Sequence, residues 1–114
     1  MTVDEIYLKI GQEIVNVIET DNWKNARLEF EIAGEGIVGY TGDYLENDET
    51  MDISVENIDD DITDWLNELH EITTEGGNNR WNKSVFSLTP DGKYDMEFIW
   101  DQELYDEVQR LSKS

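Results

Sequence analysis

Residues 24–45 read KNARLEFEIAGEGIVGYTGDYL, and the pattern within them predicts a β-hairpin. Leu28, Phe30 and Ile32 alternate with charged residues, which is typical of a strand with one buried and one exposed face. Gly34 and Gly36 close this strand, and residues 37–45 supply its partner. We therefore expect an antiparallel sheet whose apolar face must be covered by other elements.

Three other segments have the apolar spacing of amphipathic helices. The first spans residues 3–19, and the second carries its apolar stripe over residues 58–72. Asn57 or Asp59 could cap this second helix, and Gly76-Gly77 could end it. The third begins near Asp101 and should turn four residues inward: Leu104, Tyr105, Val108 and Leu111.

Strand-like alternation returns in residues 50–56 and on both sides of the turn TPDGK, residues 89–93. The strand after that turn should have four inward residues: Tyr94, Met96, Phe98 and Trp100. The resulting order is α-β-β-β-α-β-β-α. It predicts an α+β fold, with an antiparallel β-sheet of about five strands and helices packed on one face. The 114 residues suit one domain, residues 1–114.

The charge of the chain restricts the classes of partner. Twenty-eight Asp and Glu face eight Lys and Arg, which gives a net charge of −20. Such a surface repels nucleic acids and anionic membranes and attracts basic proteins or cations. No apolar run reaches the roughly 18 residues of a membrane span, and no basic leader is present. We therefore expect a cytoplasmic protein that binds neither nucleic acid nor membrane.

Catalytic and metal-binding patterns are missing from the sequence. It contains no cysteine, and its one histidine, His70, lies in the middle of the second helix, where we expect it to be solvated. EF-hand registers starting at Asp43, Asp48 and Asp59 each place apolar residues or a non-glycine residue at required positions. With so many acids, the proximity of two carboxylates carries no information about acid–base catalysis. We predict no enzyme activity, no cofactor and no metal site.

The acids are unevenly placed along the chain. Between Arg27 and Arg80 there are sixteen Asp and Glu and no Lys or Arg. In the second helix Asp60, Asp64 and Glu68 follow one another at intervals of four, so that like charges are neighbours and mildly destabilise the helix. The dipole at the helix start favours Asp residues there, but it does not explain the later acids.

Two interpretations of these acids remain open. They could be an ordinary solvated surface, as in a halophile, or a recognition surface with tyrosines as anchors. For the second interpretation, the candidate partner-binding residues are Tyr40, Asp43, Tyr44, Glu46, Asp48, Glu49, Asp52, Asp60, Asp64, Glu68 and Glu71. Trp100 is a further aromatic candidate near them.

Two segments give the chain a family resemblance. IYLKIGQEIVNVIETDNWKNARLEFEI (residues 6–32) and WNKSVFSLTPDGKYDMEFIW (residues 81–100) flank the acidic helix. In this order and spacing they resemble the YezG-like immunity proteins. That resemblance implies an antitoxin that neutralises a secreted polymorphic nuclease toxin, of the LXG or contact-dependent type. It implies no catalytic residues, because such a protein acts by binding.

The expected function is therefore that of an immunity protein that binds the basic C-terminal domain of a cognate nuclease toxin through its acidic surface. The alternative is a free-standing acidic mimic of nucleic acid, or an adaptor, that binds basic host proteins broadly.

Overall fold

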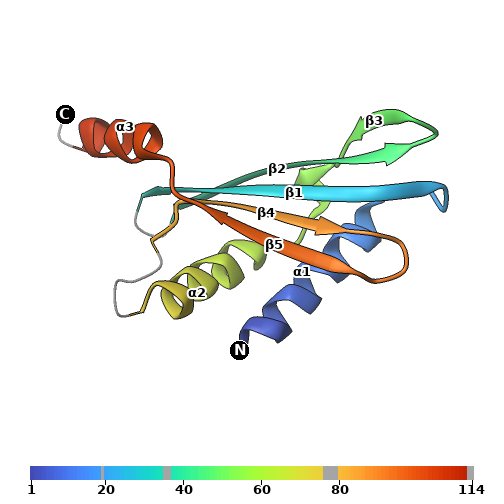
Figure 1. Cartoon of the computed structure of the whole chain (residues 1–114), viewed down its shortest axis with the longest axis horizontal. Helices are drawn as coiled ribbons and strands as arrows, with labels where there is room; N and C mark the ends of the chain where they lie inside the picture. The colour runs from blue at the N-terminus through green and yellow to red at the C-terminus, as the bar shows by residue number, and fades with distance from the viewer. Residues whose placement is uncertain (19, 35–36, 76–79, 113–114) are drawn as a thin grey trace.

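The computed structural model describes residues 1–18, 20–34, 37–75 and 80–112. Its elements follow the expected order and confirm the α+β fold class (Figure 1). The helices and strands are α1 (Val3–Val17), β1 (Trp23–Gly34), β2 (Ile37–Glu46), β3 (Glu49–Asp52), the 3₁₀ helix η1 (Val55–Asn57), α2 (Ile62–Thr74), β4 (Lys83–Leu88), β5 (Tyr94–Ile99) and α3 (Gln102–Ser112).

The five strands form one antiparallel sheet in the order β3-β2-β1-β4-β5. Strand β1 is the longest and lies at the centre, where Leu28 is opposite Gly42 of β2 and Phe86 of β4. Directly opposite residues share one face of the sheet, so this register aligns the apolar positions of neighbouring strands.

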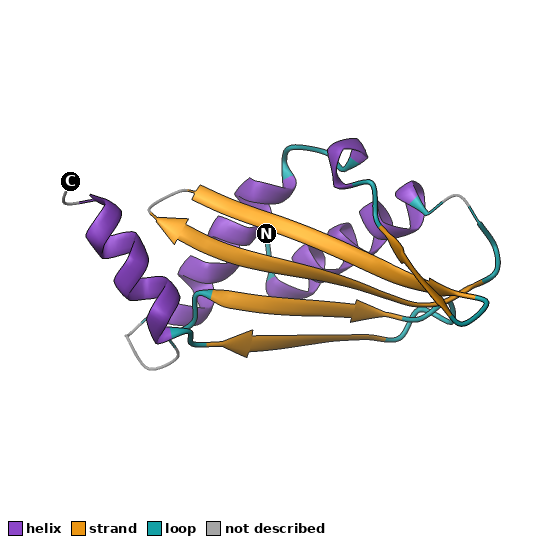
Figure 2. Ribbon diagram, turned by 90° about the horizontal axis from the view of Figure 1, so that it is seen from above, coloured by secondary structure: helices purple, strands orange, loops and turns teal. Residues whose placement is uncertain are grey.

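Helices α1 and α2 cover one face of this sheet, and none of the described helices covers the other face (Figures 1 and 2). Ile6, Ile10 and Ile14 of α1 are fully buried against Phe30 and the other core side chains. Helix α1 begins with a capping box, in which the Thr2 hydroxyl accepts from the Glu5 backbone N–H. The core therefore lies between the two helices and the sheet.

The segment between β3 and α2 differs from the sequence prediction. Strand β3 ends at Asp52, where residues 50–56 had been expected to continue as a strand, and η1 follows. Helix α2 begins only at Ile62, and neither Asn57 nor Asp59 is its N-cap. Instead, the carboxylate of Asp59 accepts from the backbone N–H of Asp61 and holds a turn before the helix. The proposed stops at Gly36 and Gly76-Gly77 lie outside the described residues.

Helix α3 lies beyond the end of the sheet, outside the layer that α1 and α2 form (Figures 1 and 2). The prediction that its apolar stripe is buried was only partly right. Leu104 and Val108 are half-buried, whereas Tyr105 is 38% exposed and Leu111 is 63% exposed. The helix starts where the edge strand β5 ends, so only part of its surface can reach the sheet.

Within the part of the chain that the structure describes, no helix is both long and apolar enough to cross a membrane.

Candidate functional site

The β2–β3 hairpin concentrates carboxylates in an unfavourable arrangement. Asp43 is directly opposite Asp52, and Glu46 is directly opposite Glu49. Like charges in opposite positions of two strands destabilise their pairing. The hairpin nonetheless places such pairs at two of its four paired positions. We call Asp43, Glu46, Asp48, Glu49 and Asp52 the acidic hairpin.

The turn of the acidic hairpin adds its fifth carboxylate. Asn47 and Asp48 both have positive φ, 50° and 64°, as in the two-residue type I′ turns that suit the twist of a hairpin. Asn and Asp tolerate this left-handed conformation better than other non-glycine residues. Asp48 is consequently exposed at the tip, between the strands that carry the other four acids.

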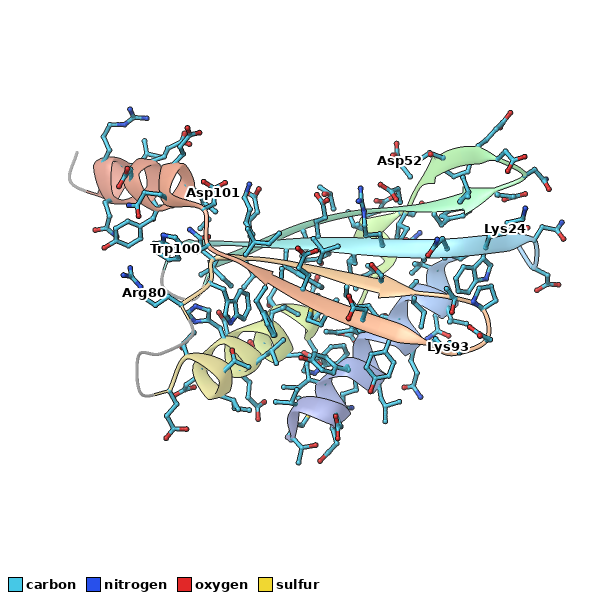
Figure 3. The ribbon with its side chains drawn as sticks, viewed as in Figure 1. Lys24, Asp52, Arg80, Lys93, Trp100 and Asp101 are labelled. Carbon is cyan, nitrogen blue, oxygen red and sulfur yellow. The ribbon has the colours of Figure 1, made fainter. Side chains whose placement is uncertain are left out.

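Positive charge near the acidic hairpin is sparse. Nη2 of Arg27 lies 3.5 Å from Asp43 and 3.6 Å from Glu29, on the sheet face that the helices leave open. These three side chains are at least a third exposed, so the pairs contribute little stability. Lys24 lies toward the same end of the sheet (Figure 3). Among the described residues, no ion pair reaches Glu46, Asp48, Glu49 or Asp52.

The two tyrosines expected to anchor a partner are in fact packed against the core. Tyr40 and Tyr44 lie on the helix-covered face of β2, and both are half-buried. The Tyr40 ring lies 6.1 Å from that of Phe30. Burial, followed by the nearby charge of Asp60, raises the pKa of Tyr40 above its usual value. Each tyrosine therefore packs against the core with part of its side chain and leaves the rest exposed.

The acids of α2 lie in the helical layer, apart from the hairpin tip. Asp60 precedes the helix, and Asp64, Glu68 and Glu71 follow along it. The α-amino nitrogen of Met1 lies 2.5 Å from the Glu68 carboxylate, and this hydrogen bond raises the pKa of the amino group. The predicted acids therefore belong to two parts of the fold, the acidic hairpin and the segment at and along α2; we call Asp60, Asp64, Glu68 and Glu71 the α2 acids.

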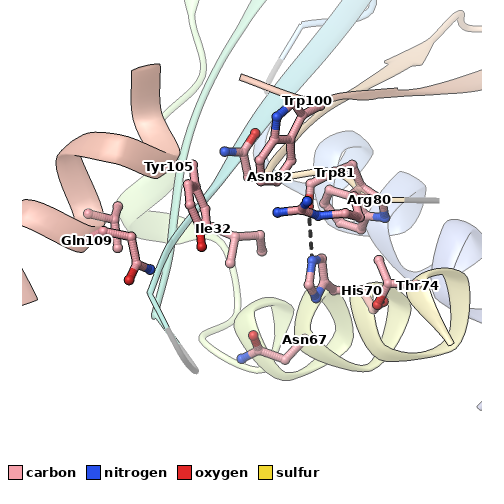
Figure 4. A pocket seen from close by; sticks show the side chains of 11 residues that line it. Ile32, Asn67, His70, Thr74, Arg80, Trp81, Asn82, Trp100, Tyr105 and Gln109 are labelled. Carbon is pink, nitrogen blue, oxygen red and sulfur yellow. Dashed lines mark hydrogen bonds between the residues drawn. The ribbon is translucent and has the colours of Figure 1, made fainter. Parts of the chain in front are cut away.

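A pocket of about 410 Å³ lies at the opposite end of the sheet from Asp52, between α2, the start of β4 and α3 (Figures 3 and 4). Its lining residues include four with aromatic rings, one cation and one amide: His70, Trp81, Trp100 and Tyr105, then Arg80, then Asn82. None of the described residues that line it is Asp or Glu, although these make up 28 of the chain's 114 residues. We call this the aromatic pocket.

Part-buried hydrogen bonds hold Trp81 and His70 at the aromatic pocket. Trp81 is 2% exposed, and its indole N–H donates to Oγ1 of Thr73 at 2.7 Å. His70 Nε2–H donates to the backbone oxygen of Trp81 at 2.9 Å, and the two rings meet edge to face at 4.8 Å (Figure 4). The prediction that His70 is a solvated helix residue was therefore wrong, because the side chain is half-buried against Trp81.

The wall next to α3 is fixed by Asn82 and Asp101. The Asn82 amide donates to the Asp101 backbone oxygen at 2.8 Å and accepts from the Asp101 N–H at 2.7 Å. The Asp101 carboxylate accepts from the Leu104 N–H at 3.1 Å and lies 2.9 Å from Nζ of Lys83. The hydrogen bond with Lys83 lowers the pKa of Asp101 and raises that of Lys83. These contacts set the angle at which α3 leaves β5.

Arg80 lies over the rim of the aromatic pocket. Its guanidinium carbon is 4.3 Å from the ring centre of Trp100 and 5.7 Å from that of Tyr105. This site was not predicted from the sequence, because it depends on where α3 lies. The available signal was the pair Arg80-Trp81, the first positive charge after a gap of more than fifty residues, placed beside an aromatic ring.

Among the described residues, no group of three or more His, Asp or Glu is arranged to hold a metal ion. Neither a protein-family model nor a curated protein matches this chain. The resemblance to YezG-like immunity proteins therefore stays a prediction.

Proposed function

We propose that this chain is an immunity protein, acting in the cytoplasm, that binds the basic domain of a cognate nuclease toxin and blocks its substrate-binding surface. The observation that carries the proposal is the acidic hairpin, with its two directly opposed acid–acid pairs.

These pairs are hard to explain as a contribution to folding. Like charges opposite each other destabilise a sheet by a few tenths of a kcal/mol to about 1 kcal/mol per pair. A solvated surface needs acids, but it does not need them in opposition. A basic partner that places Lys or Arg between Asp43 and Asp52, or between Glu46 and Glu49, would convert this repulsion into attraction.

Binding of this kind requires no chemistry from the immunity protein. The hairpin lies at one end of a body with extents of 45 × 30 × 22 Å, so its tip can enter a cleft (Figure 1). A nuclease cleft is lined with positive charge because it binds phosphates. The five carboxylates of the acidic hairpin would occupy that charge in place of the substrate.

The α2 acids have a different role in this proposal. They belong to the chain's net charge of −20, which speeds the encounter with a basic partner without needing contact. Charge-steered association is about 10- to 1,000-fold faster than neutral association at low salt. The acidic hairpin therefore supplies contact, and the α2 acids supply long-range attraction.

The direct experiment uses the nuclease domain encoded beside this chain's gene. We expect its cleavage of nucleic acid to stop when the two proteins reach a one-to-one ratio. An unrelated basic nuclease is the control, and its activity should be unaffected at that ratio. Full cleavage by the neighbouring nuclease in the presence of excess immunity protein would overturn the proposal. Equal inhibition of both nucleases would instead favour a general acidic mimic of nucleic acid.

A further inference from the structure

We infer that the aromatic pocket is a second binding site, whose ligand is a small aromatic carboxylate. The inference does not depend on the proposed immunity function. Arg80 and Trp100 lie at one end of the sheet and Asp52 of the acidic hairpin lies at the other (Figure 3).

The size and rigidity of the pocket suit a small ligand. Its volume of about 410 Å³ falls within the range of roughly 300–1,000 Å³ that is usual for ligand sites. Trp81 is held by Thr73 and His70, and Asn82 is held by the backbone of Asp101. Walls fixed in this way need little reordering when a ligand binds.

The shape of the lining favours a flat, apolar ligand body. The rings of Trp100 and Tyr105 lie 5.2 Å apart and tilt by 44°, and Trp81, which is 2% exposed, is also among the lining residues (Figure 4). Aromatic walls hold planar groups by stacking and edge contacts. A benzene-sized ring is therefore the body that these walls fit.

The charge of the lining favours a negative head group. Among the described lining residues, Arg80 is the one Lys or Arg, and none carries a carboxylate. Among the described residues no acid lies within ion-pairing distance of Arg80, as is also the case for Lys9, Lys24 and Arg110. The Arg80 guanidinium stacks on rings, which leaves its edge of N–H donors free to bind a planar carboxylate.

The net charge of the chain opposes an anionic ligand but does not decide the outcome. At physiological ionic strength the Debye length is about 8 Å, so distant acids are largely screened. Arg80 would touch the ligand directly, and a charge-assisted contact of that kind outweighs screened repulsion.

The test follows the four indole N–H signals by NMR at physiological salt while phenylacetate is added. We expect saturable binding with a dissociation constant of about 1 mM, which is reasonable for a ligand of this size. The signals of Trp81 and Trp100 should shift. Those of Trp23 and Trp65, which do not line the pocket, should not.

Matched ligands and variants test the role of charge. The neutral analogue 2-phenylethanol should bind about tenfold more weakly than phenylacetate, because it cannot form the charge-assisted contact. Arg80→Gln should weaken phenylacetate about tenfold and leave 2-phenylethanol within about twofold. Arg110→Gln changes the net charge equally, but Arg110 does not line the pocket, so this variant should bind both probes like wild type.

One further ligand distinguishes two sources of such a carboxylate, a peptide C-terminus and a free small molecule. N-acetylglycyl-phenylalanine carries the same aromatic ring and carboxylate at a peptide C-terminus. Tighter binding than phenylacetate would assign the site to a peptide end, and weaker binding would assign it to a free small molecule.

The inference is overturned if no Trp81 or Trp100 signal moves at about 10 mM phenylacetate, ten times the expected dissociation constant. It is also overturned if 2-phenylethanol binds as tightly as phenylacetate, or if Arg80→Gln weakens both equally. Unchanged Trp23 and Trp65 signals in the Arg80→Gln variant show that it is folded.

Discussion

Replacing Gly42 by alanine should destabilise the base of the acidic hairpin. A Cβ atom at this position would lie 2.7 Å from Cδ1 of Leu28, 2.8 Å from the backbone oxygen of Arg27 and 3.0 Å from Cδ1 of Ile53. The side-chain ends can move, but the carbonyl belongs to the central strand β1 and cannot. Strand β2 must therefore shift, and the backbone N–H of Ile53, which donates to the Gly42 oxygen at 2.9 Å, must shift with it.

The size of the effect follows from two opposing contributions. Overpacking of a filled core costs about 1–3 kcal/mol. Replacing a glycine also lowers the conformational entropy of the unfolded chain, which stabilises the folded state by about 0.4–1 kcal/mol. We therefore expect Gly42→Ala to lower the free energy of unfolding by about 1–2 kcal/mol and the melting temperature by about 4–8 °C.

Gly39→Ala is the matched control on the same strand, because a Cβ atom there would meet nothing within 4 Å. It should raise the free energy of unfolding by about 0.4–1 kcal/mol. Urea unfolding followed by tryptophan fluorescence measures both variants. The described packing of β2 on β1 would be refuted if Gly42→Ala were as stable as wild type, or if Gly39→Ala were the less stable variant.

Three further predictions test individual contacts. Asp48→Gly should raise the free energy of unfolding in urea by about 0.5–1 kcal/mol, because relief of about 1–2 kcal/mol of left-handed strain at a φ of 64° exceeds the roughly 0.4–1 kcal/mol that glycine costs through the entropy of the unfolded chain, and Asp48→Val should lower it. Thr73→Val should lower it by about 1–3 kcal/mol in urea unfolding, because the buried indole N–H of Trp81 loses its acceptor; a neutral result would contradict that hydrogen bond. Asp101 has a pKa below its usual 3.8, so its bond to Lys83 contributes stability above that pH and loses it as the pH falls through the lowered value. The melting-temperature deficit of Asp101→Asn should therefore be present at neutral pH and shrink in acid, and a deficit that is the same at every pH would disprove the ionic contribution.

The elements with strong periodicity could be predicted from the sequence. The alternation of apolar residues in β1 predicted a strand, and their helical spacing in α1 predicted a helix. Both predictions were right, because each segment buries one face in the same core. The predicted start of α2 was wrong. The Asp triplet before the helix is compatible with a helix terminus, but it forms a turn held by Asp59.

The two candidate sites depend on features that a single sequence does not contain. The opposed acids of the hairpin follow from its register, and the register depends on the turn at Asn47 and Asp48, which lacks the glycine that usually marks a type I′ turn. The aromatic pocket depends on the position of α3, which is set by the exit of the chain at Asn82 and Asp101. Neither the hairpin turn nor the contact between Asn82 and Asp101 produces a periodic pattern in the sequence.

The most direct test of the account is a kinetic measurement of binding to the neighbouring toxin domain with two charge-matched variants. Glu46→Gln/Asp52→Asn removes two charges from the acidic hairpin, and Asp64→Asn/Glu71→Gln removes two from α2. We expect the hairpin variant to dissociate faster and to bind about a hundredfold more weakly, because it loses direct contacts. The α2 variant should associate only severalfold more slowly and dissociate at the wild-type rate. Equal effects of the two variants on the dissociation rate, or none, would contradict the acidic hairpin as the contact surface.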